Sequence, residues 1–312
     1  METQNGPEKS RQTPSVELAA ELDSQGWLAA PGEDLTAYAE RLEQEQRKIK
    51  DFNEQLDREK VLEPYTGLVV DASSRIPQEI LAEAAETTRA AYGFDIRWVP
   101  GFFPVHGLGL LWGGCSISSD EDIPALFIIR RSFAKNKRWF IYSRSELTSH
   151  ELCHVARTPL NDMEYEEHFA YAISGSPLRR YSGNCFKSEK DALLFLLPVF
   201  LLLAVQLLRV SLWPMIPALP FWILIFVWPA WLLILNAASR KRYFRAENAL
   251  KSYTDRPGAV LFRCTAAEIN RLAEIADQPE EVRNFLNEKK DSDLRWQIIY
   301  HRFMNKKEDT NG

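Results

Sequence analysis

The chain has 312 residues, enough for one sizeable globular domain with accessory segments. Its net charge of -5 and the lack of a basic stripe exclude nucleic acid as an expected partner. The four scattered cysteines form no C-x-x-C pair, so neither a disulfide framework nor a thiolate zinc site is expected, and a reducing compartment fits. The first 60 residues lack the apolar core of a secretory signal, so we expect the N-terminus to stay in the compartment of synthesis.

The N-terminal segment divides into a polar tail and helices. Residues 1–14 are polar and are expected to be disordered. Residues 34–60 carry a heptad-like apolar stripe that predicts a helix, formed by Leu35, Tyr38, Leu42, Ile49, Phe52 and Leu56. This stripe packs either on the chain itself or on a second copy, which would make a homo-oligomer. Pro77 and Gly93 frame a further alanine-rich helix.

Short apolar runs then predict strands. They are IRWVP at 96–100, LGLLW at 108–112, ALFII at 125–129 and RWFIY at 138–142. The last two flank SFAKNK, and we expect them to form a hairpin. A helix follows to residue 157, capped by Ser143 or Ser145 and ended by Thr158-Pro159. A second helix is expected from about 162 to 174, with Asn161 and Glu164 in a capping-box-like start.

The first of these two helices contains the sequence HELCH, an HExxH motif. Its two histidines, His150 and His154, are four residues apart and share one helical face, where neutral imidazoles suit Zn²⁺. Glu151 can act as the general base toward a water molecule at the metal. A metzincin would need glycine at 157 and histidine at 160, but the sequence has Arg157 and Leu160.

The third ligand is expected on the second helix. After a short turn, Glu167 lies about 7.5 Å along its helix, nearly level with His154 at about 6 Å along the first. Glu166 is level too but points about 100° away, and Glu164 sits a turn too close to the loop. We rank Glu167 first, then Glu166, then Glu164; His168 is a lesser candidate that we expect to be exposed or to support the site.

Four other residues have weaker roles. Tyr171, one turn beyond Glu167, can donate to a developing oxyanion or simply pack. Arg157 can pair with an acid of the second helix, although such an arginine is usually solvated. Cys153 faces away from the histidines as a small buried apolar residue. Glu146 can support His150 from one turn away.

HELCH followed by EEHFAY resembles the gluzincin branch of the zinc metallopeptidases, over roughly residues 125–175. In that group the third ligand opens a Glu-x-x-Ala motif, which EHFA at 167–170 matches, so the resemblance places the ligand on Glu167. Tyr171 departs from the Asp that is common there in membrane-bound CaaX-type peptidases. The resemblance implies a zincin-like core, whose last edge strand aligns substrate beside the active helix.

Residues 192–238 contain one charge, Arg209. Two arms, 192–208 and 220–238, are each near the length that crosses a hydrocarbon core of about 30 Å. They predict a transmembrane hairpin, with a buried hairpin of a soluble protein as the alternative. The flanks place both chain ends on the cytoplasmic side, because they are basic: Arg179, Arg180, Lys187, Lys190, Arg240, Lys241, Arg242 and Arg245.

Helices are expected again in the C-terminal tail. Thr265 and Glu268 form a capping box, and residues 293–303 suggest a further helix. The predicted fold class is therefore α+β. It comprises an N-terminal segment (1–64), a zincin-like catalytic domain (65–187), a transmembrane hairpin (188–242) and a helical cytoplasmic tail (243–312).

The sequence thus predicts a membrane-anchored zinc endopeptidase that acts on protein or peptide substrates beside the lipid bilayer. An intramembrane protease is rejected, since the polar neighbours of the motif would be costly in lipid. The alternative is a catalytically inactive zincin-like membrane scaffold or binding module, which would not need the retained Glu151.

Overall fold

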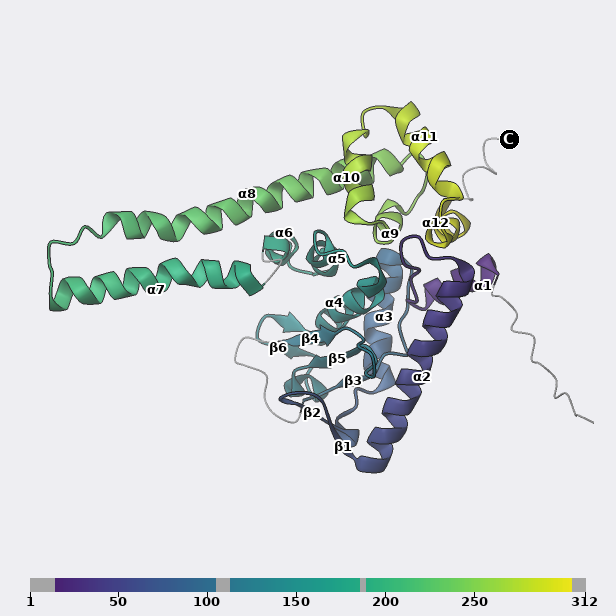
Figure 1. Cartoon of the computed structure of the whole chain (residues 1–312), viewed down its shortest axis with the longest axis horizontal. Coiled ribbons are helices and arrows are strands. Elements are labelled where there is room, and N and C mark those ends of the chain that lie inside the picture. Colours follow the sequence, from purple (N-terminus) through teal and green to yellow (C-terminus); the bar gives the residue numbers. More distant parts are fainter. Residues whose placement is uncertain (1–14, 105–112, 186–188, 305–312) are drawn as a thin grey trace, which may run out of the picture.

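The computed structural model describes residues 15–104, 113–185 and 189–304, and within them the chain is a mixed α+β protein, mostly helical with small sheets (Figure 1). The predicted α+β class is confirmed at this level. The helices are α1 (Val16–Ser24), α2 (Leu35–Glu59), α3 (Gln78–Tyr92), α4 (Arg144–Arg157), α5 (Glu166–Ala172), α6 (Pro177–Ser182), α7 (Glu189–Ser211), α8 (Leu219–Leu250), α9 (Pro257–Leu261), α10 (Ala266–Glu274), α11 (Pro279–Lys290) and α12 (Leu294–Ile299). The strands are β1 (Val61–Tyr65), β2 (Leu68–Asp71), β3 (Gly101–Phe102), β4 (Gly114–Ile117), β5 (Leu126–Ile129), β6 (Arg138–Trp139) and β7 (Tyr142–Ser143). Residues 1–14 and the predicted strand at 108–112 lie outside the described residues.

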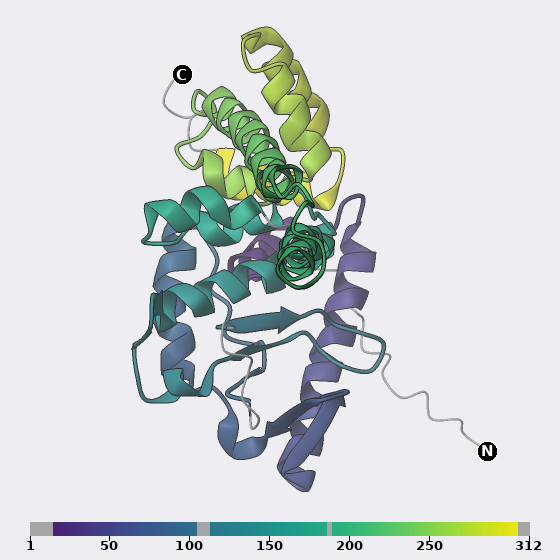
Figure 2. The ribbon, with the colours of Figure 1, turned by 90° about the vertical axis from the view of Figure 1, so that its left-hand side faces the viewer.

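A three-stranded sheet lies between α2 on one face and α3 with α4 on the other, as Figure 2 shows from the side. Its central strand, β5, pairs in parallel with β3 and antiparallel with β4. Because successive side chains of a strand point to opposite faces, Leu126 and Ile128 pack toward α2, whereas Phe127 and Ile129 join the core with α3 and α4. The uninterrupted apolar run of β5 follows from burial on both faces.

The apolar stripe of α2 is covered by the chain itself. Asp34 caps the helix by accepting from two backbone amides, and Tyr38, Leu42, Phe52 and Leu56 are all buried. The self-packing interpretation of the stripe is therefore confirmed for these residues.

Two expectations about the strands are wrong. Residues 125–129 and 138–142 do not form a hairpin, since both edges of β5 are occupied by β3 and β4 and residues 138–143 close on themselves as β6 and β7. Residues 96–100 form a buried loop in place of a strand. Trp98 stacks on Trp27 with ring centroids 3.6 Å apart, and its indole donates to the carbonyl of Gln25. The stacking and the hydrogen bond hold Trp98 against the N-terminal segment without any strand pairing.

The helices that follow α8 pack back onto the body. Phe262 stacks on Tyr92 with ring centroids 4.2 Å apart, and both belong to one continuous core. Cationic side chains also cap the C-terminal end of α3, where a helix carries partial negative charge. The donor–carbonyl pairs are Arg256 with Arg89 and Ala90, Arg263 with Tyr92, and Arg302 with Gly93. The boundary expected between residues 242 and 243 thus falls inside α8.

The hairpin of α7 and α8 leaves the body on one side (Figure 1). Leu193–Ser211 and Leu219–Leu250 have mean hydropathies of 2.5 and 2.0, and only 11% of the apolar window in each is buried. Both helices are long and apolar enough to cross a membrane. The second helix runs past the predicted end of its arm at 238 and carries the chain without a break into the C-terminal helices.

Stability should depend strongly on Arg263, whose guanidinium donates to the buried Asp23 and to the carbonyls of Tyr92 and Ala259. Arg263→Met should lower the free energy of unfolding by about 3–5 kcal/mol, since two buried carbonyls lose their donor and the buried Asp23 keeps only Arg302 as a cationic partner. Denaturant unfolding of the full chain in detergent measures the change. Arg97→Met is the matched control, because Arg97 pairs with Asp95 at the surface and its loss should cost about 0–1 kcal/mol. Equal losses in the two variants would contradict the prediction.

Candidate metal centre

Helix α4 turns one side to the core and the other to a cleft. Cys153 is buried on the core side, as expected, and His150 and His154 lie on the cleft side one helical turn apart. Arg144 at the start of α4 pairs with Glu83 of α3 at 2.8 Å, and this ion pair holds the helix in place. The histidines are therefore presented from a firmly packed element.

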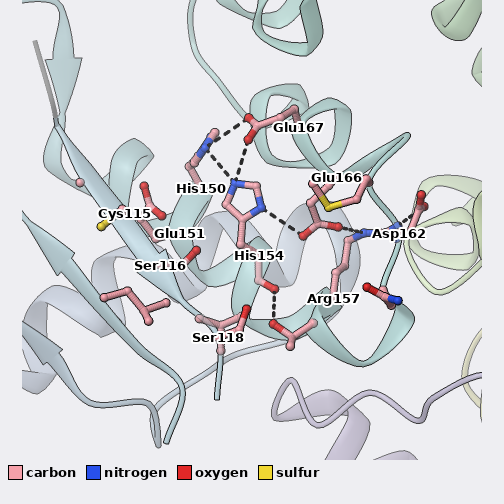
Figure 3. Close-up of a pocket in the computed structure, with 16 residues that line it drawn as sticks. Cys115, Ser116, Ser118, His150, Glu151, His154, Arg157, Asp162, Glu166 and Glu167 are labelled. Carbon is pink, nitrogen blue, oxygen red and sulfur yellow. Dashed lines mark hydrogen bonds and ion pairs between the residues drawn. The ribbon is translucent and has the colours of Figure 1, made fainter. Parts of the chain in front are cut away.

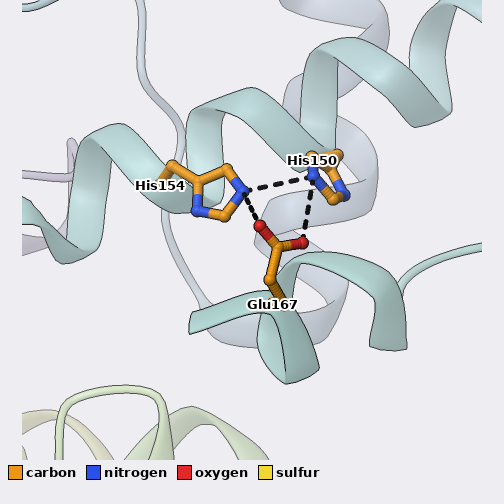
Figure 4. A group of neighbouring side chains, drawn as sticks. All are labelled: His150, His154 and Glu167. Carbon is orange, nitrogen blue, oxygen red and sulfur yellow. Dashed lines mark hydrogen bonds and ion pairs between the residues drawn. The ribbon is translucent and has the colours of Figure 1, made fainter. Parts of the chain in front are cut away.

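The structure brings His150, His154 and Glu167 together (Figure 4). The two Nε2 atoms of the histidines are 3.1 Å apart, and the carboxylate oxygens of Glu167 lie 3.7 Å from Nε2 of His150 and 3.6 Å from Nε2 of His154. Glu167, the acid ranked first, thus faces both imidazoles from the neighbouring helix α5, although it lies in the first turn of that helix and not five residues along it.

These distances fit one tetrahedral zinc ion. With metal–ligand bonds of about 2.0–2.1 Å, the ligand atoms of a tetrahedral site stand about 3.3 Å apart. The imidazole nitrogens are 3.1 Å apart, each lies 3.6–3.7 Å from a different oxygen of Glu167, and with one atom taken from each residue all three lie within 4.8 Å of one another, so a small adjustment of the carboxylate would complete the site. Two imidazoles and one carboxylate, with a fourth position open to a cleft, are the donor set of a catalytic zinc site.

Glu166 holds His154 from behind (Figure 3). One of its oxygens lies 3.0 Å from Nδ1 of His154, and the other accepts from Arg157 at 2.9 Å. A carboxylate on the second ring nitrogen fixes the tautomer and orientation of a metal-ligating histidine. Glu166 therefore orients His154, and the predicted pairing of Arg157 with an acid of the second helix is confirmed, whereas the alternative of a solvated Arg157 is wrong. Arg157 is fully buried, because it also donates to Asp162 and to the carbonyl of Phe262.

The other acids and His168 lie elsewhere. Glu164 accepts from Arg242 of α8 at 2.6 Å, away from the histidines. His168 is buried against Tyr243, with ring centroids 4.1 Å apart, so it is neither exposed nor beside the cluster. Helix α5 also begins at residue 166 and not near 162. Asp162 accepts the backbone amide of Glu164 and holds this segment as a turn.

Glu151 is buried between the histidines and strand β4. Ser116 on β4 lies beside its carboxylate, and polar contact with the hydroxyl and the backbone amide of Ser116 partly offsets the rise in the pKa of Glu151. Among the described residues β4 pairs with no strand other than β5, and its other edge lies beside α4, with Ser116 next to Glu151. No sequence pattern points to Ser116, because its contact with Glu151 joins a strand and a helix that are 35 residues apart in the chain.

The cleft has two lobes that meet at the cluster. One, of about 550 Å³, lies toward Arg157 and Met163, and the other, of about 500 Å³, lies toward Tyr142 and Tyr171. Both lobes are bordered by Gly114, Cys115, His150, Glu151 and Glu167. A chain lying along β4 would therefore pass the metal centre with room on either side.

Tyr171 and Glu146, for which the sequence predicts supporting roles at the site, both line the second lobe. Tyr171 packs edge-on against His150, with ring centroids 4.5 Å apart, and burial raises its pKa. Glu146 does not touch His150; it pairs with Arg179 at 2.7 Å and accepts from Ser174. The sequence marks Arg179 only as one of the basic residues that precede the predicted hairpin, because its place in this lobe depends on the turn between α5 and α6.

The electrostatics of the site favour one shared proton on the histidine pair. Burial and the neighbouring His154 lower the pKa of His150 to about 3. Burial alone would lower the pKa of His154, but the hydrogen bond with Glu166 and the charges of Glu167 and Glu151 raise it to about 9. Burial raises the pKa of Glu151 to about 7, with His154 opposing and Glu167 assisting the shift.

Zinc affinity should rise with pH. A proton on His154 competes with a metal ion for Nε2, and the pKa of this imidazole is about 9. The apparent association constant should therefore increase about tenfold per pH unit below that pKa. Competition with a chromophoric chelator between pH 6 and 8 measures it. An affinity that does not change over this range would contradict the assignment.

Zinc affinity should also depend on Glu166. Glu166→Gln removes the charge that orients His154 and should weaken zinc binding about 10–100-fold. Glu164→Gln is the matched control, since Glu164 bonds to Arg242 and Asn270 away from the cluster and its neutralisation should leave affinity unchanged. The same chelator competition reads both variants. If the two lose affinity equally, Glu166 has no special role.

The chain was compared with models of protein families, with curated proteins and with solved structures, and none of them matches it. What the site does is therefore argued from its own geometry.

Proposed function

We propose that the protein is a membrane-anchored, zinc-dependent endopeptidase whose active site faces the cytoplasm. The observation that carries the proposal is the convergence of His150, His154 and Glu167 on one point, with Glu151 buried beside it. A zinc ion at this point would supply Lewis-acid activation of water and of a carbonyl oxygen.

The chain's own residues suit peptide hydrolysis. Glu151 lies beside the cluster, between the histidines and β4, where it can accept a proton and then return it to a leaving amine. Ser116 lies next to its carboxylate and can orient it. Tyr171 borders the second lobe, where it can donate to an oxyanion.

One edge of β4 has no strand partner among the described residues, and this edge is an argument for a polypeptide as the substrate. Unpaired backbone groups of an edge strand can bind an extended peptide as an additional strand. Lobes on both sides of the cluster leave space for substrate residues before and after the cleaved bond, which favours an endopeptidase. An edge strand antiparallel to its neighbour, beside the HExxH helix, also agrees with a zincin-like fold.

The hairpin supports membrane anchoring. α7 and α8 have the length and apolarity of transmembrane helices, and the basic flanks favour an orientation with both ends of the hairpin on the cytoplasmic side. The metal centre belongs to the body outside the hairpin, so an aqueous active site near the bilayer surface follows.

Glu151→Gln tests the function. The variant should bind about one zinc ion per chain, like the parent, and should lose about 10²–10⁴-fold in the rate of peptide cleavage because the general base is gone. Metal analysis and cleavage of a peptide library by the detergent-purified chain measure both properties. Zinc binding without any cleavage by the parent chain would favour the inactive scaffold or binding module.

A further inference from the structure

Two neighbouring elements expose large apolar side chains beside the second lobe of the cleft. The turn between β6 and β7 exposes Phe140 (85%) and Ile141 (56%), and α6 exposes Leu178 (73%) and Tyr181 (44%). We call these four residues the apolar rim. The carbonyl of Ile141 accepts from Arg179 at 2.6 Å, so the turn and α6 are joined directly.

Phe140 is an unfavourable residue for its position. It is the first residue of a two-residue hairpin turn and has a φ of 51°, a left-handed conformation that glycine or asparagine adopts more easily. A bulky aromatic residue there strains the backbone and leaves an apolar ring in water. Retained strain of this kind points to a functional contact that needs the side chain.

The chain around the rim is strongly basic. Residues 131–142 and 175–185 contain no Asp or Glu, and they contain six cations: Arg131, Lys135, Lys137, Arg138, Arg179 and Arg180. Two of them pair with acids from elsewhere in the chain, Arg179 with Glu146 and Lys137 with Glu83, and the other four make no ion pair with an acid among the described residues. Apolar side chains surrounded by cations are suited to the headgroup region of an anionic bilayer, where each surface Lys or Arg adds to binding.

The rim lies on the side of the body from which the hairpin leaves. Figure 1 shows α6 and β6 on that side, and Figure 2 looks along the hairpin onto it. Helix α6 is fixed to α8 through Asn236, which donates to the carbonyl of Tyr181 at 2.6 Å, and through Arg240, which donates to that of Arg180 at 2.6 Å. A bilayer crossed by the hairpin would therefore meet the rim as well.

We propose that the apolar rim docks the body onto an anionic lipid surface and that the adjoining lobe takes the membrane-proximal segment of a membrane protein. Tyr142 and Arg179 line this lobe, and each is next in sequence to a rim residue. The substrate part of this inference rests on the proposed peptidase function, whereas the docking part rests only on the hairpin and the rim.

Lipid-borne quenchers test the docking without any use of activity. The full chain is placed in nanodiscs of phosphatidylcholine and phosphatidylserine, with a fluorescent amino acid at one position at a time. Positions 141 and 178 report the rim, 203 the hairpin, and 280, on the exposed start of α11, is the control. We expect a headgroup-level quencher to act at 141 and 178, an acyl-chain quencher at 203, and neither at 280.

Two other outcomes of the quenching experiment would contradict the proposal. If 203 is quenched while 141 and 178 behave like 280, the rim does not dock. If 203 is not quenched, the hairpin does not enter the bilayer, and both the anchoring and the docking fail.

A paired cleavage assay tests the substrate class. Phe140→Asn relieves the left-handed strain and removes the aromatic ring, so the fold is retained. It should slow cleavage of a peptide tethered directly at the bilayer surface by roughly tenfold, through weaker alignment of the lobe with the membrane. Cleavage of the same peptide free in solution should not change. Equal rates for variant and parent on the tethered peptide would overturn the substrate assignment, and quenching at 178 would still report docking if no peptide were cleaved.

Discussion

The buried guanidinium of Arg157 is the interaction on which the site depends. It binds Asp162 in the turn between α4 and α5, Glu166 at the start of α5, and the carbonyl of Phe262 in the C-terminal helices. Three parts of the chain are thereby fixed around one cation, and one of them, Glu166, holds His154. A buried cation of this kind is tolerated only when its donors are all well paired, so it selects one arrangement of α4 against α5.

That arrangement explains why the site needs the C-terminal helices. Glu167 follows Glu166 directly, so the same ion pair that orients His154 sets the position of the carboxylate facing both imidazoles. The aromatic stack of Phe262 on Tyr92 keeps the Phe262 carbonyl in reach of Arg157. The packing of Phe262 on Tyr92, away from the cleft, thus helps to set how far apart the side chains of His150, His154 and Glu167 lie.

The sequence was most informative where the pattern is local. HExxH on a helix places His150 and His154 on one face, and the helical rise together with the direction around the second helix ranks Glu167 first. The capping box of Thr265 and Glu268 is confirmed, as is the existence of two helices long enough to cross a membrane. The partners of β5 and the burial of Arg157 were missed, because they depend on contacts distant in sequence. The Phe262 carbonyl that accepts from Arg157 is 105 residues away.

Helix α8 joins the two ends of the molecule mechanically. Its 32 residues form a rod of about 48 Å, one end in the apolar hairpin and the other against α10. On the way it touches the segment that leads into α5, through Arg242 with Glu164, and α5 itself, through Tyr243 with His168. Pro229 lies in the apolar part of α8, and the helix runs on from it to Leu250, so a tilt of this last part would shift its contacts with Glu164 and His168, which flank Glu167 in sequence. In the membrane-anchored protein proposed above, a change in bilayer thickness that tilts α8 would therefore act on the position of the Glu167 carboxylate.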